Sequence, residues 1–142
     1  MINTKLTRKA MVIAYNAHDG QVDKSGVPYI YHPIHVAEQM DTEEECIVAL
    51  LHDVVEDTNM TFEQLSEIFS KEIIDILRLL TRKEEENYFD YILKIAKNPV
   101  AKKVKIADLM HNLDETRLNK ITKIDIKRRE KYKKALEILE NN

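Results

Sequence analysis

Ten residues in the middle of the chain, Ala49–Thr58 (ALLHDVVEDT), place four ionisable side chains in an otherwise apolar run. The apolar residues predict a buried helix, on which positions four apart share a face. His52 would then lie under Glu56, and Asp53 would lie under Asp57. Burying such groups without partners costs several kcal/mol each. We therefore expect a metal ion or a strong hydrogen-bond network to compensate them.

Two further stretches set ionisable groups among apolar residues. Tyr29–Pro33 (YIYHP) carries His32 after a turn-like segment, and Val104–Asn112 (VKIADLMHN) carries Asp108 in a helical run. Each group alone is compatible with a solvated helix face or with a satisfied core histidine. Several ionisable groups in apolar runs, however, usually meet at one site. The three stretches together predict a functional site built from distant parts of the chain.

The composition favours a single all-α domain. The chain has 142 residues, of which 44% are hydrophobic and 33% are charged, with only two glycines and three prolines. A chain of this length can bury a continuous core, and so few turn-forming residues argue against a β architecture. The single cysteine, Cys46, excludes an intramolecular disulfide and a multi-thiolate zinc site.

Charge and hydropathy limit the partners and the compartment. The net charge is −3 and the pI is about 6.0, so the chain as a whole does not attract nucleic acid or acidic lipid. The N-terminus lacks an apolar export segment, and no window approaches the ~18 apolar residues that a membrane span needs. We expect a soluble cytoplasmic protein without nucleic-acid or membrane partners, and the sequence leaves its oligomeric state open.

Capping residues and apolar spacing predict the helices. Thr4 starts the first helix, Asp41-Thr42 starts the helix of the central run, and Pro99 suits the first turn of the helix that bears Asp108. Residues 21–31 are expected to form an ordered loop over the site. In the first half of the chain, the expected helices cover 4–17 and 42–59, and a third begins at 32 between them. In the second half, one helix begins at 61 and has an aliphatic stripe at 73–80, one runs from 88 and ends before 99, and one covers 99–112. The last expected helix is amphipathic and covers 123–139, with Ile124, Tyr132, Leu136 and Leu139 as its apolar set.

The motifs around these residues resemble those of a known family. His32, the pair His52-Asp53, and Asp108 are similar to the metal-binding signature of the HD phosphohydrolase superfamily. Longer matches resemble the hydrolase domain of RelA/SpoT-type proteins: HDGQ at 18–21, KSG at 24–26, PYI at 28–30, HP at 32–33, HDVVEDT at 52–58, KIAD at 105–108 and HN at 111–112. The resemblance covers residues 10–112 and implies an HD-domain helical bundle with a metal site between helices. The length of the chain predicts one such domain over residues 1–142. Residues 119–142 match nothing specific in the family, and their apolar spacing predicts a terminal amphipathic helix.

The resemblance also implies a role for each matched residue. It implies His32, His52, Asp53 and Asp108 as metal ligands, Glu56 and Asp57 as the catalytic pair, and Lys24, Ser25 and Asn112 as substrate contacts. Two imidazoles and two carboxylates suit Mn²⁺, Fe²⁺, Ni²⁺ or Zn²⁺ better than Mg²⁺ or Ca²⁺. The resemblance favours Mn²⁺ among these ions.

The implied activity is metal-dependent phosphohydrolysis of a small nucleotide. In the resembled family the reaction removes the 3′-pyrophosphate of ppGpp, the nucleotide of the stringent response, to give GDP and pyrophosphate. One alternative is hydrolysis of a different nucleotide or phosphoester, and another is a metal-binding sensor or interaction module with little turnover.

Two positions depart from the family pattern. Asp23 stands where the family usually has arginine, and Leu109 stands where it commonly has a basic residue. Both departures remove positive charge in or near the expected site, and an anion at position 23 would repel a phosphate-rich ligand. Asp23→Arg is therefore expected to tighten the binding of a guanosine tetraphosphate.

Overall fold

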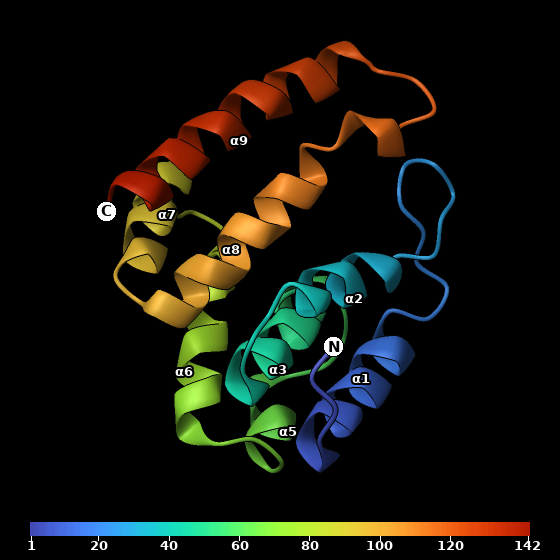
Figure 1. Cartoon of the computed structure of the whole chain (residues 1–142), viewed down its shortest axis with the longest axis vertical. Helices are drawn as coiled ribbons and strands as arrows, with labels where there is room; N and C mark the ends of the chain where they lie inside the picture. The colour runs from blue at the N-terminus through green and yellow to red at the C-terminus, as the bar shows by residue number, and fades with distance from the viewer.

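Side-chain hydrogen bonds start most of the helices. The computed structural model describes residues 1–142 and contains nine α-helices, one 3-10 turn and no strand (Figure 1). Thr4, Thr42, Thr61 and Thr122 each accept a hydrogen bond from the backbone three residues ahead, and all but Thr42 form a complete capping box. The elements are α1 (Lys5–Ala17), α2 (Tyr31–Glu38), α3 (Glu43–Leu51), α4 (Val54–Asp57), α5 (Phe62–Ser66), α6 (Lys71–Leu80), α7 (Tyr88–Ala96), α8 (Pro99–Asn112), η1 (Glu115–Arg117) and α9 (Lys123–Asn141). The predicted all-α fold class is confirmed.

Helix α3 occupies the centre of the bundle. Its residues Cys46–Leu51 are all buried, as expected of a helix that is apolar on every side. The helices α1, α2, α6 and α8 pack around it. Ala10 and Ala14 of α1 are fully buried, and their small side chains allow close packing against α3. This arrangement places the C-terminal end of α3, and the residues that follow it, inside the fold.

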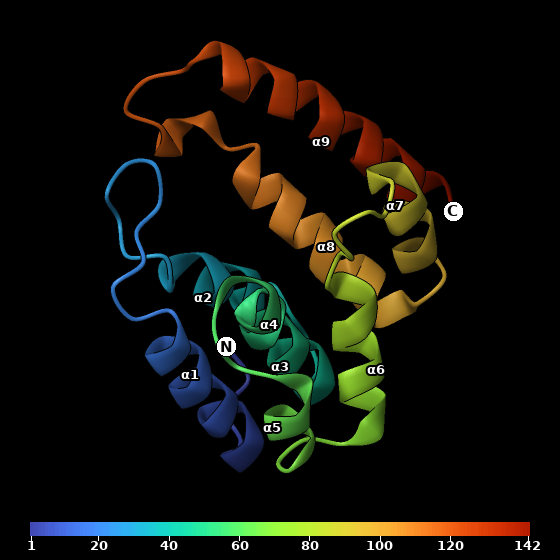
Figure 2. The same ribbon diagram turned by 180° about the vertical axis from the view of Figure 1, so that it is seen from behind.

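Helix α9 lies along α7 and α8 at the edge of the bundle (Figures 1 and 2). Ala135 and Leu139 are fully buried and anchor it there. Ile124 is 63% exposed, so its predicted membership of the apolar set is wrong, whereas Tyr132 and Leu136 pack against the core. The difference arises because the first turns of α9 extend past α7 and stand off from the end of α8 (Figure 1).

Two predicted helices are each divided in two. The expected helix 42–59 breaks at His52-Asp53 into α3 and α4, and the apolar segment 61–80 forms α5 and α6. The expected loop at 21–31 is present, although Tyr31 already belongs to α2. No helix combines the length and the apolar character that crossing a lipid bilayer requires.

Candidate metal centre and adjoining pocket

Four side chains from three parts of the fold converge beside the end of α3. His32 comes from the first turn of α2, His52 and Asp53 from the turn between α3 and α4, and Asp108 from α8. The Nε2 atoms of His32 and His52 lie 2.8 and 3.6 Å from Oδ1 of Asp108. Nε2 of His52 also lies 3.0 Å from Oδ2 of Asp53. The structure therefore brings together the four residues predicted as metal ligands.

The break after α3 explains how two consecutive residues can face one point. Neighbouring side chains on a continuous helix diverge by about 100°. Here the Ala49 carbonyl accepts a 2.6 Å hydrogen bond from Nδ1 of His52, where a continuing helix would receive the backbone amide of Asp53. The expectation of one unbroken helix with His52 under Glu56 is wrong, because the chain turns at this point and aims both side chains at the site.

Nε2 of His52 is a buried nitrogen without a hydrogen-bond partner. Because Nδ1 donates to the Ala49 carbonyl, Nε2 of the neutral ring presents a lone pair to the carboxylates of Asp53 and Asp108. For the neutral ring this arrangement is repulsive, so either a proton on Nε2 or a metal ion has to lie among these atoms. Ligand atoms of His32, His52 and Asp53 lie within 4.8 Å of one another. The mixed nitrogen and oxygen donors therefore fit a divalent transition-metal ion.

The surrounding charges favour a cation at this place. Burial acts to lower the pKa of His52, but the carboxylates of Asp53 and Asp108 outweigh it and raise this pKa well above its usual range. Burial acts to raise the pKa of Asp53, whereas the neighbouring His52 ring brings it down to about 2. Lys105 similarly outweighs burial at Asp108 and holds its pKa well below the usual range. Both carboxylates are therefore ionised at neutral pH.

Hydrogen bonds orient the candidate ligands from outside. Nζ of Lys105 donates to Oδ2 of Asp108 at 2.8 Å, and Nδ2 of Asn112 donates to Oδ1 at 3.1 Å. Nδ1 of His32 lies 2.8 Å from Nδ1 of His111. Such outer contacts fix the orientation of metal ligands. Asn112, predicted as a substrate contact, thus supports Asp108, and it also lines the neighbouring pocket.

Three polar residues surround the outer side of Asp53. The hydroxyl of Tyr29 donates a hydrogen bond to its Oδ2. Carboxylate oxygens of Asp53, Glu56 and Asp57 lie within 4.8 Å of one another. Glu56 and Asp57 are exposed, so the expectation that the central run buries all four ionisable groups is wrong, because α4 is a single turn at the surface. Loss of hydration and repulsion from Asp53 raise the pKa of both groups.

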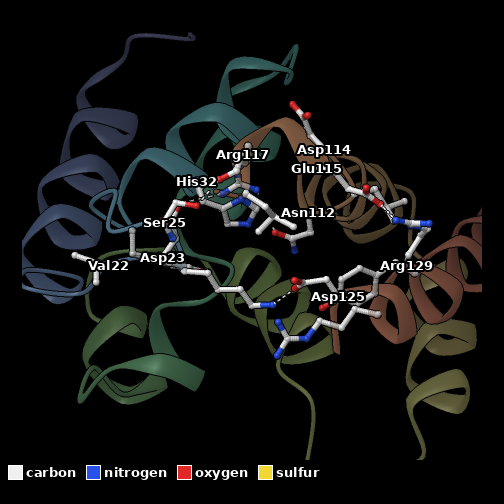
Figure 3. A pocket seen from close by; sticks show the side chains of 16 residues that line it. Val22, Asp23, Ser25, His32, Asn112, Asp114, Glu115, Arg117, Asp125 and Arg129 are labelled. Atoms are coloured by element: carbon white, nitrogen blue, oxygen red, sulfur yellow. Dashed lines mark hydrogen bonds and ion pairs between the residues drawn. The ribbon is translucent and has the colours of Figure 1, made fainter. Parts of the chain in front are cut away.

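A pocket of about 360 Å³ opens beside His32 (Figure 3). Its walls are the loop at 22–29, the segment that joins α8 to η1, and the first half of α9. Figure 3 shows Asp125 and Arg129 on the opposite side of the pocket from Asp23 and Ser25. The charged side chains in the walls are the cations Lys24, Arg117, Arg128 and Arg129 and the carboxylates Asp23, Asp114, Glu115 and Asp125.

Ion pairs and a hydrogen bond join the walls of the pocket. The pairs are Lys24 with Asp125, Arg129 with Glu115, and Arg117 with Asp23 at 3.8 Å. Ser25 donates through Oγ to the carbonyl of Arg117 at 2.6 Å. Arg128 is the one cation of the pocket that has no carboxylate within 4.0 Å. The predicted substrate contacts Lys24 and Ser25 therefore lie in the pocket but are engaged by its other wall.

Most of the chain matches a known protein family. A family model described as an HD domain matches residues 10–135. The chain belongs to the HD-domain family. The predicted resemblance of this HD domain to the RelA/SpoT-type hydrolase domain is also confirmed by the relatives that it matches.

Relatives of this HD domain include much longer bacterial proteins. It is 35% identical over 124 residues to the bifunctional (p)ppGpp synthase/hydrolase SpoT of Escherichia coli (strain K12), covering 77% of this chain and 18% of that protein. It is 39% identical over 117 residues to the guanosine-3′,5′-bis(diphosphate) 3′-pyrophosphohydrolase of Haemophilus influenzae. That match covers 72% of this chain and 17% of the other protein. The chain thus spans less than a fifth of the length of these relatives.

A solved structure is similar over nearly the whole chain. It belongs to a metazoan ortholog of SpoT, which is described as hydrolysing ppGpp and as having a role in starvation responses. The TM-score is 0.78 at 26% sequence identity, and the match covers 98% of this chain and 85% of the other.

Asp23 anchors the loop of this HD domain. Its Oδ1 accepts hydrogen bonds from the backbone amides of Ser25 and Val27, at 2.8 and 3.0 Å, and its Oδ2 faces Arg117. The pocket thus keeps a guanidinium next to Asp23, contrary to the expectation of a simple loss of positive charge. Leu109 is 1% exposed within the core. Position 109 therefore does not line the pocket, and the leucine there removes no positive charge from it.

Several residues of the site were absent from the predicted set. They include Tyr29, Arg117, Asp125, Arg128 and Tyr132. Tyr29 precedes His32 by three residues, and this short separation could have predicted that Tyr29 lies at the site. Arg128 and Tyr132 share a helix face by their four-residue spacing, but no local pattern shows which part of the fold that face meets.

Proposed function

We propose that this HD domain is a metal-dependent phosphohydrolase that removes the 3′-pyrophosphate of ppGpp to give GDP and pyrophosphate. The observation that carries the proposal is the unpartnered Nε2 of His52, which faces two carboxylates next to His32. A pocket with four cationic side chains adjoins this point. The names of the relatives in E. coli and H. influenzae support ppGpp as the substrate.

The proposed ion is Mn²⁺, with Fe²⁺, Ni²⁺ and Zn²⁺ as alternatives. His32, His52, Asp53 and Asp108 would hold it, and Lys105 and Tyr29 would keep the two carboxylates in place. When bound, such an ion lowers the pKa of water and polarises a phosphoryl group.

Glu56 and Asp57 would move the protons of the reaction. One carboxylate takes a proton from the attacking water while the water oxygen bonds to the phosphorus next to the ribose. The other carboxyl group donates a proton to the ribose 3′-oxygen as the bond between that oxygen and phosphorus breaks. Loss of hydration and repulsion from Asp53 raise the pKa of both groups, which makes each carboxylate a stronger base than an ordinary surface carboxylate.

The nucleotide would lie in the pocket beside His32. Lys24, Ser25 and Asn112 are the proposed contacts, and Arg128 is added because its guanidinium has no carboxylate partner. A small nucleotide is thus the proposed partner, met in the cytoplasm, without nucleic acid or a membrane. Residues 1–142 would act as one domain.

A different nucleotide or phosphoester is the second candidate substrate. The pocket contains as many carboxylates as cations, four of each, whereas a ligand as anionic as ppGpp would gain from an excess of positive charge. Turnover is favoured over a purely sensory role because Glu56 and Asp57 lie next to Asp53.

The test is turnover by the Mn²⁺-loaded protein. Purified protein is incubated with ppGpp, pppGpp, GTP, NADPH or a generic phosphodiester, beside an Asp53→Ala variant. We expect release of pyrophosphate from ppGpp that EDTA and Asp53→Ala both abolish. Release no faster than that of the variant would reject ppGpp, and turnover of another compound in the series would establish the second candidate.

A further inference from the structure

The ion pair between Lys24 and Asp125 joins residues that are 101 positions apart in the chain. Lys24 belongs to the loop that precedes α2, and Asp125 belongs to the first turn of α9. The two side chains meet in the pocket, where Asp125 extends toward the loop (Figure 3). The pair therefore occupies space that a ligand of the pocket would enter.

The two partners differ in mobility. Oδ2 of Asp125 accepts hydrogen bonds from the amide and the hydroxyl of Thr122, at 2.8 and 2.9 Å, while its Oδ1 faces Lys24. The carboxylate is thus held by the helix cap, and its side chain is only 8% exposed. The Lys24 side chain is 46% exposed, and its long stem can reorient at little cost. Lys24 is therefore the partner that can leave the pair.

The loop stays attached if Lys24 leaves. Ser25 still donates to the Arg117 carbonyl, and Asp23 still binds the loop amides and faces Arg117. These contacts do not involve the Lys24 ammonium. Exchange of its counter-ion therefore needs no opening of the loop.

We propose that Asp125 is a specificity-determining residue that acts as the internal counter-ion of Lys24, so that an entering nucleotide phosphate must displace this carboxylate from the Lys24 ammonium. The fixed carboxylate weakens the binding of every ligand whose anionic group takes its place on Lys24, by the free energy of the pair that is lost. A ligand that occupies the pocket without contacting Lys24 carries no such cost, so the pair discriminates between ligands. The inference rests on the proposed function only in that the pocket takes a phosphate-bearing nucleotide.

Substitution of Asp125 distinguishes this role from a purely structural one, in which the ion pair only holds the loop against α9. Asp125→Asn keeps an oxygen that can accept the Thr122 hydrogen bonds and removes the charge that holds Lys24. If Asp125 competes with the ligand, removing its charge tightens binding. If Asp125 only holds the pocket together, removing its charge leaves affinity equal or weaker.

The experiment measures GDP binding to the Mn²⁺-loaded protein by titration calorimetry. We expect Asp125→Asn to lower the Kd of GDP by about three- to tenfold, the scale of one partly exposed ion pair. Asp75→Asn is the matched control, because Asp75 pairs with Lys71 on α6, outside the pocket. Its Kd should stay within about twofold of the original protein.

A Lys24→Met background completes the double-mutant cycle. Asp125→Asn should have no effect on the Kd there, because no ammonium remains to be released. An unchanged or higher Kd in the folded Asp125→Asn protein, the same gain in the Lys24→Met background, or no GDP binding by any of these proteins would overturn the inference.

Two further measurements keep the test independent of folding and of turnover. If Asp125→Asn unfolds, Asp125→Gln replaces it, since glutamine at this position also completes a capping box. Labelling of Lys24 by an amine-acylating reagent, followed by mass spectrometry, should be faster in the Asp125→Asn protein and slower with GDP present. Failure of ppGpp hydrolysis would reject the proposed activity and would leave these binding results as they stand.

Discussion

The hydroxyl of Tyr29 donates a hydrogen bond to Oδ2 of Asp53, the oxygen that also faces Nε2 of His52. Burial and the Asp53 charge raise the pKa of Tyr29 above its usual range, so the phenol remains a donor at neutral pH. Tyr29 therefore limits the rotation of a proposed metal ligand from the side of the pocket.

We expect Tyr29→Phe to lower Mn²⁺ affinity by about tenfold, the usual effect of losing an outer hydrogen bond to a ligand. Calorimetric titration of Mn²⁺ measures this change, with circular dichroism as the check on folding. Tyr15→Phe, at an exposed position of α1, is the control and should bind Mn²⁺ normally. Equal affinities in the two variants would show that Tyr29 does not orient Asp53.

The pair of Lys105 and Asp108 should show a non-additive effect on stability. The two side chains are 14% and 6% exposed and lie 2.8 Å apart. In the presence of EDTA at pH 7, Asp108→Asn should lower the free energy of unfolding by about 2 to 4 kcal/mol, because it leaves the Lys105 ammonium without its counter-ion. Urea unfolding measures this loss.

The double variant Lys105→Met/Asp108→Asn is the control for that prediction. It should be more stable than Asp108→Asn alone, since no uncompensated buried ammonium remains. A double variant as unstable as the sum of the two single variants would contradict the argument.

The ion pairs of Lys103 with Asp41 and Glu45 predict a pH dependence. Burial acts to raise the pKa of Glu45, but hydrogen bonds from Lys103 and from the Asp41 amide outweigh it and lower the pKa below its ordinary value of 4.5. A carboxylate whose pKa falls on folding stabilises the protein fully above its unfolded pKa. That stabilisation disappears as the pH falls through the folded pKa.

Glu45→Gln should therefore cost about 1 kcal/mol of stability at pH 7 and much less at pH 3. Urea unfolding at the two pH values gives the comparison. Glu43→Gln is the control, because Glu43 lies in the same first helical turn and has no ion-pair partner. A cost at Glu45 that is equal at both pH values would contradict the assignment.

The two roles of Asp23 can be separated by two substitutions. Asp23→Asn keeps the oxygen that accepts the Ser25 and Val27 amides and removes the charge that faces Arg117. Asp23→Arg removes both and places a cation next to that guanidinium. We expect GDP to bind the Mn²⁺-loaded Asp23→Asn protein at least as well as the original, and to bind Asp23→Arg more weakly by about fivefold or more. Tighter binding by Asp23→Arg would restore the expectation drawn from the family pattern.

Local chemistry predicted much of the fold and the identity of the ligand candidates. Thr4 and Thr61 begin helices as predicted because a capping box depends only on residues that are three apart. His32, His52 and Asp108 could be singled out because an ionisable group in an apolar run needs compensation wherever it lies.

The features that escaped prediction depend on contacts between distant segments. The apolar spacing continues through His52 and Asp53, so no local signal marks the end of α3. The sequence alone does not distinguish Asp23 from a solvent-exposed anion, because its contacts with the loop amides and with Arg117 form only in the folded chain. The role of Asp125 depends on how α9 packs, because its partner lies in a loop near the other end of the chain.

The turn after Leu51 has a consequence for engineering this protein. The Ala49 carbonyl is satisfied by an imidazole instead of the next backbone amide, so the chain gives up helix continuity to present one ring nitrogen. Stabilising substitutions are easy to find, and their recurrent cost is a loss of function where the active site needs a locally unfavourable structure. A variant that joined α3 to α4 would rotate His52 away from Asp108 while every proposed ligand remained in the sequence. Screens of this protein for heat resistance should therefore measure the metal affinity of each improved clone.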